Sequence, residues 1–166
     1  NLALMSTTTA YRKSQGKENC MLDIYRVRTR IQEIRKRVIE LEKDYKGLAK
    51  EKFVKDAKIT AAAERNLQVA IQACIDIANH IVAALGLERP VEETAEVFNA
   101  LGNEEIIPED FVDTMKKMTG YRNILVHGYL VVDANKTYEY IQNNLGDFSA
   151  FAEHIEIFIE KFEKKK

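Results

Sequence analysis

The chain has 166 residues, near the usual size of one domain, and 46% of them are hydrophobic, which is enough for a single buried core. Lysine plus arginine number 25 and aspartate plus glutamate number 26, so no chain-wide attraction to phosphate backbones exists, and any contact with nucleic acid must be local. Only seven glycines and two prolines occur among many good helix formers, and this composition predicts an all-α fold.

The first 20 residues differ in composition from the rest of the chain. Residues 6–20 are rich in Ser, Thr, Lys and Gln and contain almost nothing apolar. We therefore expect residues 1–20 to be a flexible leader, native or introduced by cloning, and Met21 to be the natural start. Residues 21–166 then form one helical domain.

The lack of a long apolar run and the presence of only two cysteines bear on the compartment and on cofactor use. No apolar run approaches the roughly 18 to 20 residues that cross a bilayer, which predicts no membrane span. Cys20 and Cys74 have no CxxC partner or neighbouring Cys/His pair of the kind that binds metal. We expect a cytoplasmic protein that uses neither a metal nor another cofactor.

The first predicted helix runs from Ile24 to Leu48. Apolar residues recur along it at alternating spacings of three and four, with charged residues between them. Such a stripe is narrow, so the helix should pack antiparallel in a bundle or along a partner chain, not at the centre of the fold.

The second predicted helix, from about Asp56 to Leu85, has a wider apolar arc and should be the central one. Gly86 is placed to end it in the left-handed conformation that helix ends favour. Pro90 then opens a short helix through Leu101, which Gly102 should close.

Two more helices complete the predicted fold. Pro108 marks a helix start, followed by acidic residues that suit the helix dipole, and Met115 and Met118 belong to its inner face. The final helix should begin near Lys136 and bury Tyr138, Ile141, Leu145, Phe148, Ile155, Phe158 and Phe162. Apart from the ambiguous segment 130–132, no strand pattern occurs, so we expect an up-and-down four-helix bundle with an additional short helix.

The segment from Tyr121 to Tyr129 is unusual for this chain because it gathers Arg, Asn, His and two Tyr around three aliphatic residues. On an unbroken helix, Arg122 and His127 would lie about 140° apart, too far to converge easily on one atom. Gly128 comes directly after the histidine, and a bend there is expected.

Arg122 and His127 supply what one reaction needs, the cleavage of RNA by its own 2′-hydroxyl. An imidazole can accept or give a proton near neutral pH. A guanidinium presents a rigid fork of donors to phosphate oxygens and stabilises the charge that grows in the transition state. The reaction requires no metal. It does require a second acid–base group, which a second copy of the chain would supply across a dimer axis.

The spacing of Arg122, His127 and Tyr129 resembles the Arg-x4-His-x-Tyr motif of the HepT toxins, within the HEPN superfamily. The segment from Glu64 to His80 is similar to the central helix of that family, and the order of helices agrees. The resemblance extends over about residues 21–162 and implies a HEPN-type helical bundle.

The resemblance also implies a function and partners. HepT toxins are homodimeric, metal-independent endoribonucleases of type VII toxin–antitoxin systems, and their two Arg/His motifs line a cleft at the subunit interface. A minimal nucleotidyltransferase antitoxin of the MntA type neutralises them by AMPylation of the motif tyrosine. In this chain Arg122 and His127 take the catalytic roles and Tyr129 the modified one. Asn123 is a weaker candidate for contact with RNA or phosphate.

Two other functions remain open from the sequence. The first is a non-catalytic substrate-binding or scaffold partner of a nucleotidyltransferase, which would not need the intact motif. The second is a helical interaction protein that uses the stripe from Ile24 to Leu48. His80 is expected to be hydrogen-bonded within the bundle, and ion pairs are the favoured interpretation of Arg65 and Asp76, with a place beside the cleft as the alternative.

Overall fold

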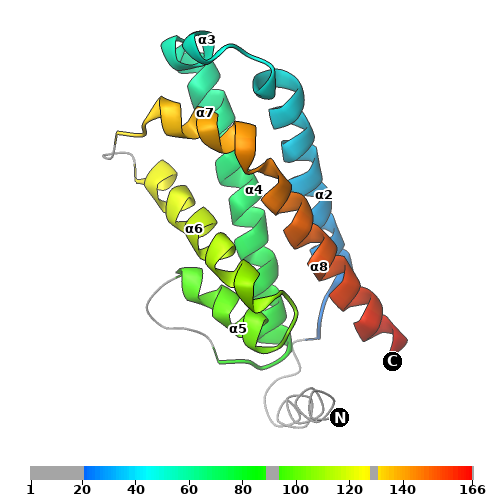
Figure 1. Cartoon of the computed structure of the whole chain (residues 1–166). Helices are drawn as coiled ribbons and strands as arrows, with labels where there is room; N and C mark the ends of the chain where they lie inside the picture. The colour runs from blue at the N-terminus through cyan, green and yellow to red at the C-terminus, as the bar shows by residue number, and fades with distance from the viewer. Residues whose placement is uncertain (1–20, 89–93, 128–130, 166) are drawn as a thin grey trace.

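The structure is a computed structural model that describes residues 21–88, 94–127 and 131–165. Its elements are α2 (Ile24–Leu41), the π-helix η2 (Glu42–Lys46), α3 (Lys50–Lys55), α4 (Ala57–Ala84), the 3-10 helix η3 (Thr94–Glu96), α5 (Val97–Asn103), α6 (Glu109–Val126), α7 (Ala134–Asn143) and α8 (Leu145–Lys164). No strand occurs in these three ranges. Figure 1 shows α2, α4, α6 and α8 alternating in direction, so the predicted all-α, up-and-down bundle is confirmed.

Helix α4 is the centre of the bundle, as its wide apolar arc predicts. It packs against α2, α5, α6 and α8, and Leu67, Ile71 and Ile81 are among its fully buried side chains. Asp56 caps the helix by accepting backbone N–H groups of Lys58 and Ile59. At the other end Gly86 adopts the predicted left-handed conformation, with φ of 65°.

The length and apolar composition of α4 correct one expectation. The helix has 28 residues and is, by length and composition alone, long and apolar enough to cross a membrane, whereas the sequence pattern predicts no such segment. Its alanines, which lie between larger apolar side chains, account for the difference. More than half of its most apolar stretch is buried inside the bundle, and the core helix of a soluble protein can be as long and as apolar as a membrane span.

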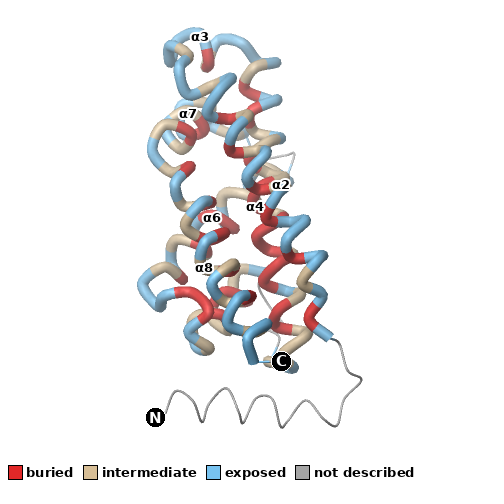
Figure 2. Tube along the Cα trace, turned by 90° about the vertical axis from the view of Figure 1, so that its right-hand side faces the viewer, coloured by how far each residue is buried: buried red, intermediate tan, exposed pale blue. Residues whose placement is uncertain are grey.

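Helix α2 lies antiparallel to α4 and buries the predicted stripe against it (Figures 1 and 2). Val27, Ile31 and Ile34 are each about 1% exposed. Asp23 caps the helix through the backbone N–H of Arg26. The regular helix ends at Leu41, and the predicted continuation through Tyr45 is a π-helical turn.

Three boundaries differ from those expected. The link after Gly47 contains the short helix α3, which inserts the fully buried ring of Phe53 into the core. The expected last helix is two helices, because Asn144 leaves helical geometry with ψ of 2°. Gly102 does not end α5, which continues to Asn103; the positive φ of the following turn, 55°, is at Glu105.

Several expectations fall on residues outside the described ranges. These are the leader at 1–20 with Cys20, the helix start at Pro90, the bend at Gly128, and Tyr129. They stay predictions. Val131 and Val132, from the segment with an ambiguous strand pattern, are not in a strand.

Candidate active site

The two candidate catalytic residues lie at the end of α6. Arg122 is in the last turns of the helix and is half-buried. His127 is the C-cap residue, with φ of −78° and ψ of 87°, and its side chain is exposed. The helix therefore ends at Val126, two residues before Gly128, and the histidine itself leaves the helical path.

The backbone of His127 remains attached to the helix. Its N–H donates to the carbonyl oxygen of Asn123 over 3.1 Å, which closes the final turn. The motif thus has a half-buried cation on a regular helix and an exposed imidazole at the point where the helix stops.

The guanidinium of Arg122 is held by two neutral side-chain amides. Nη1 donates to Oδ1 of Asn123 over 3.1 Å, and Nη2 donates to Oε1 of Gln72 on α4. The Nε–H group is buried and has no hydrogen-bond partner in the described part of the chain. Asn123, expected to contact RNA or phosphate, instead orients the arginine here; its contact with RNA stays a prediction.

Gln72 is a site residue that sequence reasoning missed. Its Nε2 donates to Oδ1 of Asp76, one turn later on α4, over 2.8 Å. Asp76 in turn forms an ion pair with Arg30 of α2, at 3.6 Å between Oδ2 and Nη2. A chain of polar contacts therefore runs from α2 through α4 to Arg122. The available signal was the Gln–Asp spacing of four on the central helix.

These polar contacts test the expectation that Arg65 and Asp76 form ion pairs. The preferred interpretation of Asp76 as an ion-pair residue is confirmed, but the pair is with Arg30 and also supports the candidate site. Arg65 is exposed on α4.

A second polar cluster anchors the same end of α6 through Tyr121. Its hydroxyl lies 2.7 Å from Oγ1 of Thr137 on α7, and Thr137 donates to Oε1 of Glu64 on α4 over 3.2 Å. The Tyr121 ring stacks on Tyr140 with centroids 5.0 Å apart and an interplanar angle of 7°. These contacts fix the helical turn that carries the next residue, Arg122.

Burial changes the acid–base properties of this cluster. Desolvation raises the pKa of Tyr121 to about 12, with the hydrogen bond to Thr137 opposing the shift and the charge of Glu64 adding to it. Desolvation also raises the pKa of Glu64, and the hydrogen bond from Thr137 opposes it. Burial raises the pKa of Tyr140 above its usual range. Tyr121 and Tyr140 are therefore structural phenols that stay neutral at physiological pH.

The two histidines outside the motif have structural contacts. Nε2 of His80 accepts the backbone N–H of Asp23 over 2.9 Å, which confirms the expected hydrogen bond within the bundle. Desolvation and the nearby charge of Arg26 lower the pKa of His80, against the opposing effect of Asp23. The ring of His154 packs edge-on against Phe111, with centroids 5.4 Å apart.

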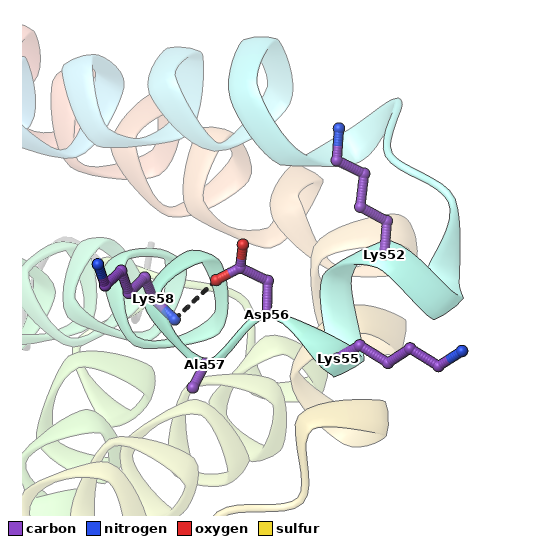
Figure 3. A pocket seen from close by; sticks show the side chains of 5 residues that line it. All are labelled: Lys52, Lys55, Asp56, Ala57 and Lys58. Atoms are coloured by element: carbon purple, nitrogen blue, oxygen red, sulfur yellow. Dashed lines mark hydrogen bonds between the residues drawn. The ribbon is translucent and has the colours of Figure 1, made fainter.

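The described residues contain no cluster of metal ligands, and an open hollow among them lies away from the motif. No group of three or more His, Cys, Asp or Glu side chains that could hold a metal ion occurs in these ranges. An open hollow lies where α3 meets the start of α4, lined by Lys52, Lys55, Asp56, Ala57 and Lys58. Figure 3 shows its three lysines pointing in different directions, while Asp56 caps the helix. It contains none of the motif residues.

Comparison with known proteins gives consistent matches over most of the chain. The family described as "Ribonuclease HepT-like" matches residues 28–155. The mRNA nuclease HepT of Shewanella oneidensis is 35% identical over 103 residues, which are 62% of this chain and 77% of that protein. The tRNA nuclease HepT of Aphanizomenon flos-aquae is 25% identical over 139 residues, which are 84% of this chain and 93% of that protein.

One solved structure among the matches is the tri-AMPylated Shewanella oneidensis HEPN toxin in complex with the MNT antitoxin. It is 30% identical to this chain and has a TM-score of 0.73. The match covers 80% of this chain and 97% of the toxin.

Proposed function

The chain belongs to the HepT-like ribonuclease family, and we propose that it is a metal-independent endoribonuclease, the toxin of a type VII toxin–antitoxin pair. The observation that carries the proposal is the geometry of Arg122: a half-buried guanidinium held by two neutral amides, five residues before an exposed histidine. RNA as substrate and the cytoplasm as the place of action belong to the same proposal.

The proposed reaction is attack of a ribose 2′-hydroxyl on the adjacent phosphorus. His127 accepts the proton of the 2′-hydroxyl as the new O–P bond forms. Arg122 stabilises the negative charge that grows on the non-bridging oxygens. The bond to the 5′-oxygen breaks, and that oxygen takes a proton from an acid. The products are a 2′,3′-cyclic phosphate and a 5′-hydroxyl.

The second acid–base group is supplied by another copy of the chain in this proposal. Because His127 is the only imidazole of the motif, a homodimer that brings two motifs together would place a base on one side of the phosphate and an acid on the other. Exposed apolar side chains lie within and just after the motif and favour such an interface: Ile124 is 43% exposed, Val126 42% and Val131 95%.

The proposed antitoxin is a minimal nucleotidyltransferase of the MntA type that AMPylates Tyr129. The Shewanella oneidensis toxin in the matched complex is described as tri-AMPylated, which supports this regulation. Nucleotides on Tyr129, two residues after the proposed base, would add bulk and negative charge beside the phosphate site. Such a modification would repel RNA.

The nuclease proposal is tested by incubating the purified chain with tRNA or an mRNA transcript in EDTA. Cleavage is expected, with a cyclic phosphate on the products, and R122A and H127A should abolish it. R35A and H154A are matched controls that remove an arginine of the α2 surface and a histidine packed on Phe111. Activity that needs a divalent ion, or that survives in H127A, would contradict the mechanism.

The regulatory proposal is tested by intact mass after incubation with an MntA-type enzyme and ATP. Each transfer adds one adenylyl group, and Y129F should prevent every addition. If Y129F is modified as fully as wild type, Tyr129 is not the acceptor. If wild type and R122A are equally harmless to cells without the antitoxin, the chain is instead a non-catalytic partner of the nucleotidyltransferase.

A further inference from the structure

The electrostatic surroundings of Arg122 are unusual for a half-buried arginine. Its guanidinium donates to the side chains of Asn123 and Gln72, and both acceptors are uncharged. In the described ranges no carboxylate lies within ion-pair distance of it, although Asp76 is only one side chain further away. The arginine is therefore held in place while no adjacent carboxylate offsets its positive charge.

The orientation of the Gln72 amide is determined from both sides. A guanidinium can only donate hydrogen bonds, so Gln72 must present its carbonyl oxygen to Arg122. An ionised carboxylate can only accept, so the amide NH2 must face Asp76. A flipped amide would lose both contacts. Gln72 is thus a neutral spacer between a cation and an anion.

Asp76 is itself held in position from a third helix. Its Oδ2 lies 3.6 Å from Nη2 of Arg30 on α2, while its Oδ1 accepts from Gln72. The carboxylate is therefore compensated by Arg30 and not by Arg122. The chain of contacts contains two cations, Arg122 and Arg30, and one anion, Asp76. Because the neutral amide of Gln72 separates Arg122 from Asp76, the carboxylate offsets the charge of Arg30 and leaves that of Arg122 uncompensated.

We propose that Gln72 is a positioning residue for Arg122, and that a neutral acceptor at position 72 is required so that the guanidinium keeps its charge for a phosphate in the transition state. This proposal rests on the nuclease function proposed above. Asp76 contributes by fixing the Gln72 amide, and Arg30 contributes by fixing Asp76.

Two substitutions separate the two roles proposed for Gln72, which are to accept a hydrogen bond from Arg122 and to carry no charge. Gln72→Glu keeps the length of the side chain and an acceptor oxygen, but it places a carboxylate against the guanidinium. Gln72→Met keeps the approximate shape and no charge, but it removes the acceptor. If Gln72 only packs, both variants should resemble wild type once they are folded.

The experiment measures kcat and KM with tRNA for wild type, Q72E, Q72M, D76N and the control Q32E. Gln32 is exposed on α2, so Q32E adds the same charge away from the site. We expect kcat to fall about 10- to 100-fold in Q72E and in Q72M, with KM changed less than about 3-fold, because the arginine acts mainly on transition-state charge. D76N should fall between these variants and wild type, and Q32E should equal wild type. Thermal unfolding of each variant checks that the fold is retained.

A second readout is independent of nuclease activity. In NMR spectra the guanidinium protons of Arg122, assigned by their absence in R122A, should be protected from exchange in wild type and Q72E and should lose that protection in Q72M. Wild-type kcat in both Q72E and Q72M, with R122A inactive, would overturn the proposal and leave the nuclease function intact. An inactive wild type would overturn the nuclease function, and unchanged protection in Q72M would separately overturn the positioning role.

Discussion

Glu64 is a carboxylate whose partly buried position favours its protonated form. Desolvation raises its pKa from the ordinary 4.5, and the hydrogen bond from Thr137 only partly opposes this. A carboxyl whose pKa is higher in the folded than in the unfolded state does not lower stability at a pH below its unfolded pKa. The loss of stability develops as the pH rises from the unfolded to the folded pKa and is complete above the folded pKa. The carboxylate is thus least compatible with the fold at neutral and alkaline pH.

We expect Glu64→Gln to raise the melting temperature at pH 8 by about 1–2 °C, a small gain because Glu64 is only half-buried and solvent still screens its charge. The amide keeps an acceptor for Thr137 and carries no charge to desolvate. The gain should shrink as the pH falls through the raised pKa of Glu64 toward the ordinary 4.5, because the folded protein then carries Glu64 in its neutral form. Differential scanning fluorimetry from pH 4 to pH 8 measures it, and a gain that is constant over this range would refute the pH dependence.

His80 has the opposite pH dependence, because burial and Arg26 lower its pKa below the ordinary 6.5. The neutral ring is the form whose Nε2 accepts from the backbone of Asp23. The stability contributed by a group with this shift is present above pH 6.5 and is lost as the pH falls through the folded pKa.

Replacing His80 by glutamine should therefore flatten the decline of stability between pH 7 and pH 5. The Gln Oε1 atom stands the same number of bonds from Cα as the His Nε2 atom and accepts a hydrogen bond without titrating. Urea unfolding at pH 5, 6 and 7 gives the comparison. We expect nearly equal stability at pH 7 and a smaller loss at pH 5 for H80Q, and an unchanged slope would show that His80 does not control the decline.

At the scale of single residues, the sequence predicts the motif but not its support. Arg122 and His127 are noticed because their segment gathers Arg, Asn, His and two Tyr around three aliphatic residues. Gln72 is a common polar residue on a long helix, and its spacing of four from Asp76 is only a weak local signal. Its role depends on the rotation and distance between α4 and α6, which is a property of packing.

Gly102 shows how one element constrains another. A methyl group at this position in α5 would lie 2.5 Å from Cγ2 of Val112 on α6, closer than a real Cβ contact. Replacement of a helical glycine by alanine ordinarily stabilises a helix by up to about 1 kcal/mol. Here the clash should outweigh that gain, because both helices belong to a packed core.

We expect Gly102→Ala to lower the free energy of unfolding by about 1–3 kcal/mol, measured by urea denaturation. Gly120→Ala is the matched control, since nothing lies within 4 Å of a Cβ built there, and it should stabilise α6 by about 0.5–1 kcal/mol. In the G102A background, V112A should restore part of the loss. A stabilised G102A would mean that the two helices separate at little cost.

Element boundaries were predictable where a side chain provides a cap and less so elsewhere. Asp56 is the N-cap of α4, and the expected boundary there differs by one residue. The break between α7 and α8 was missed, although Asn143 and Asn144 are poor helix formers, because the apolar spacing continues across them. Periodicity alone does not reveal a bend that keeps the same face buried.

At the scale of the whole molecule, the described residues expose large apolar side chains in two main places. Met21, Tyr25 and Ile39 lie on or just before α2, and a second group lies near the motif. The stripe of α2 is buried within the chain, so it is not available as the partner surface considered from the sequence. Ile124, Val126 and Val131 remain exposed on both sides of His127. The nearly balanced total charge makes a local site at such an interface the natural place to bind a phosphate.

The dimer proposal makes a prediction that separates assembly from chemistry. Ile124→Asp places a charge in the expected interface while Arg122 and His127 are unchanged. We expect this variant to be folded and monomeric by light scattering and to have lost at least about 10-fold in nuclease activity, because an isolated motif has no second acid–base group. Ile157→Asp is the matched control, because Ile157 on α8 is 44% exposed and Ile124 on α6 is 43% exposed. The two substitutions should therefore change the folding stability of a single chain by similar amounts. A monomeric I124D with full activity would mean that one chain holds a complete site, and the acid that protonates the 5′-oxygen would then have to be found within it.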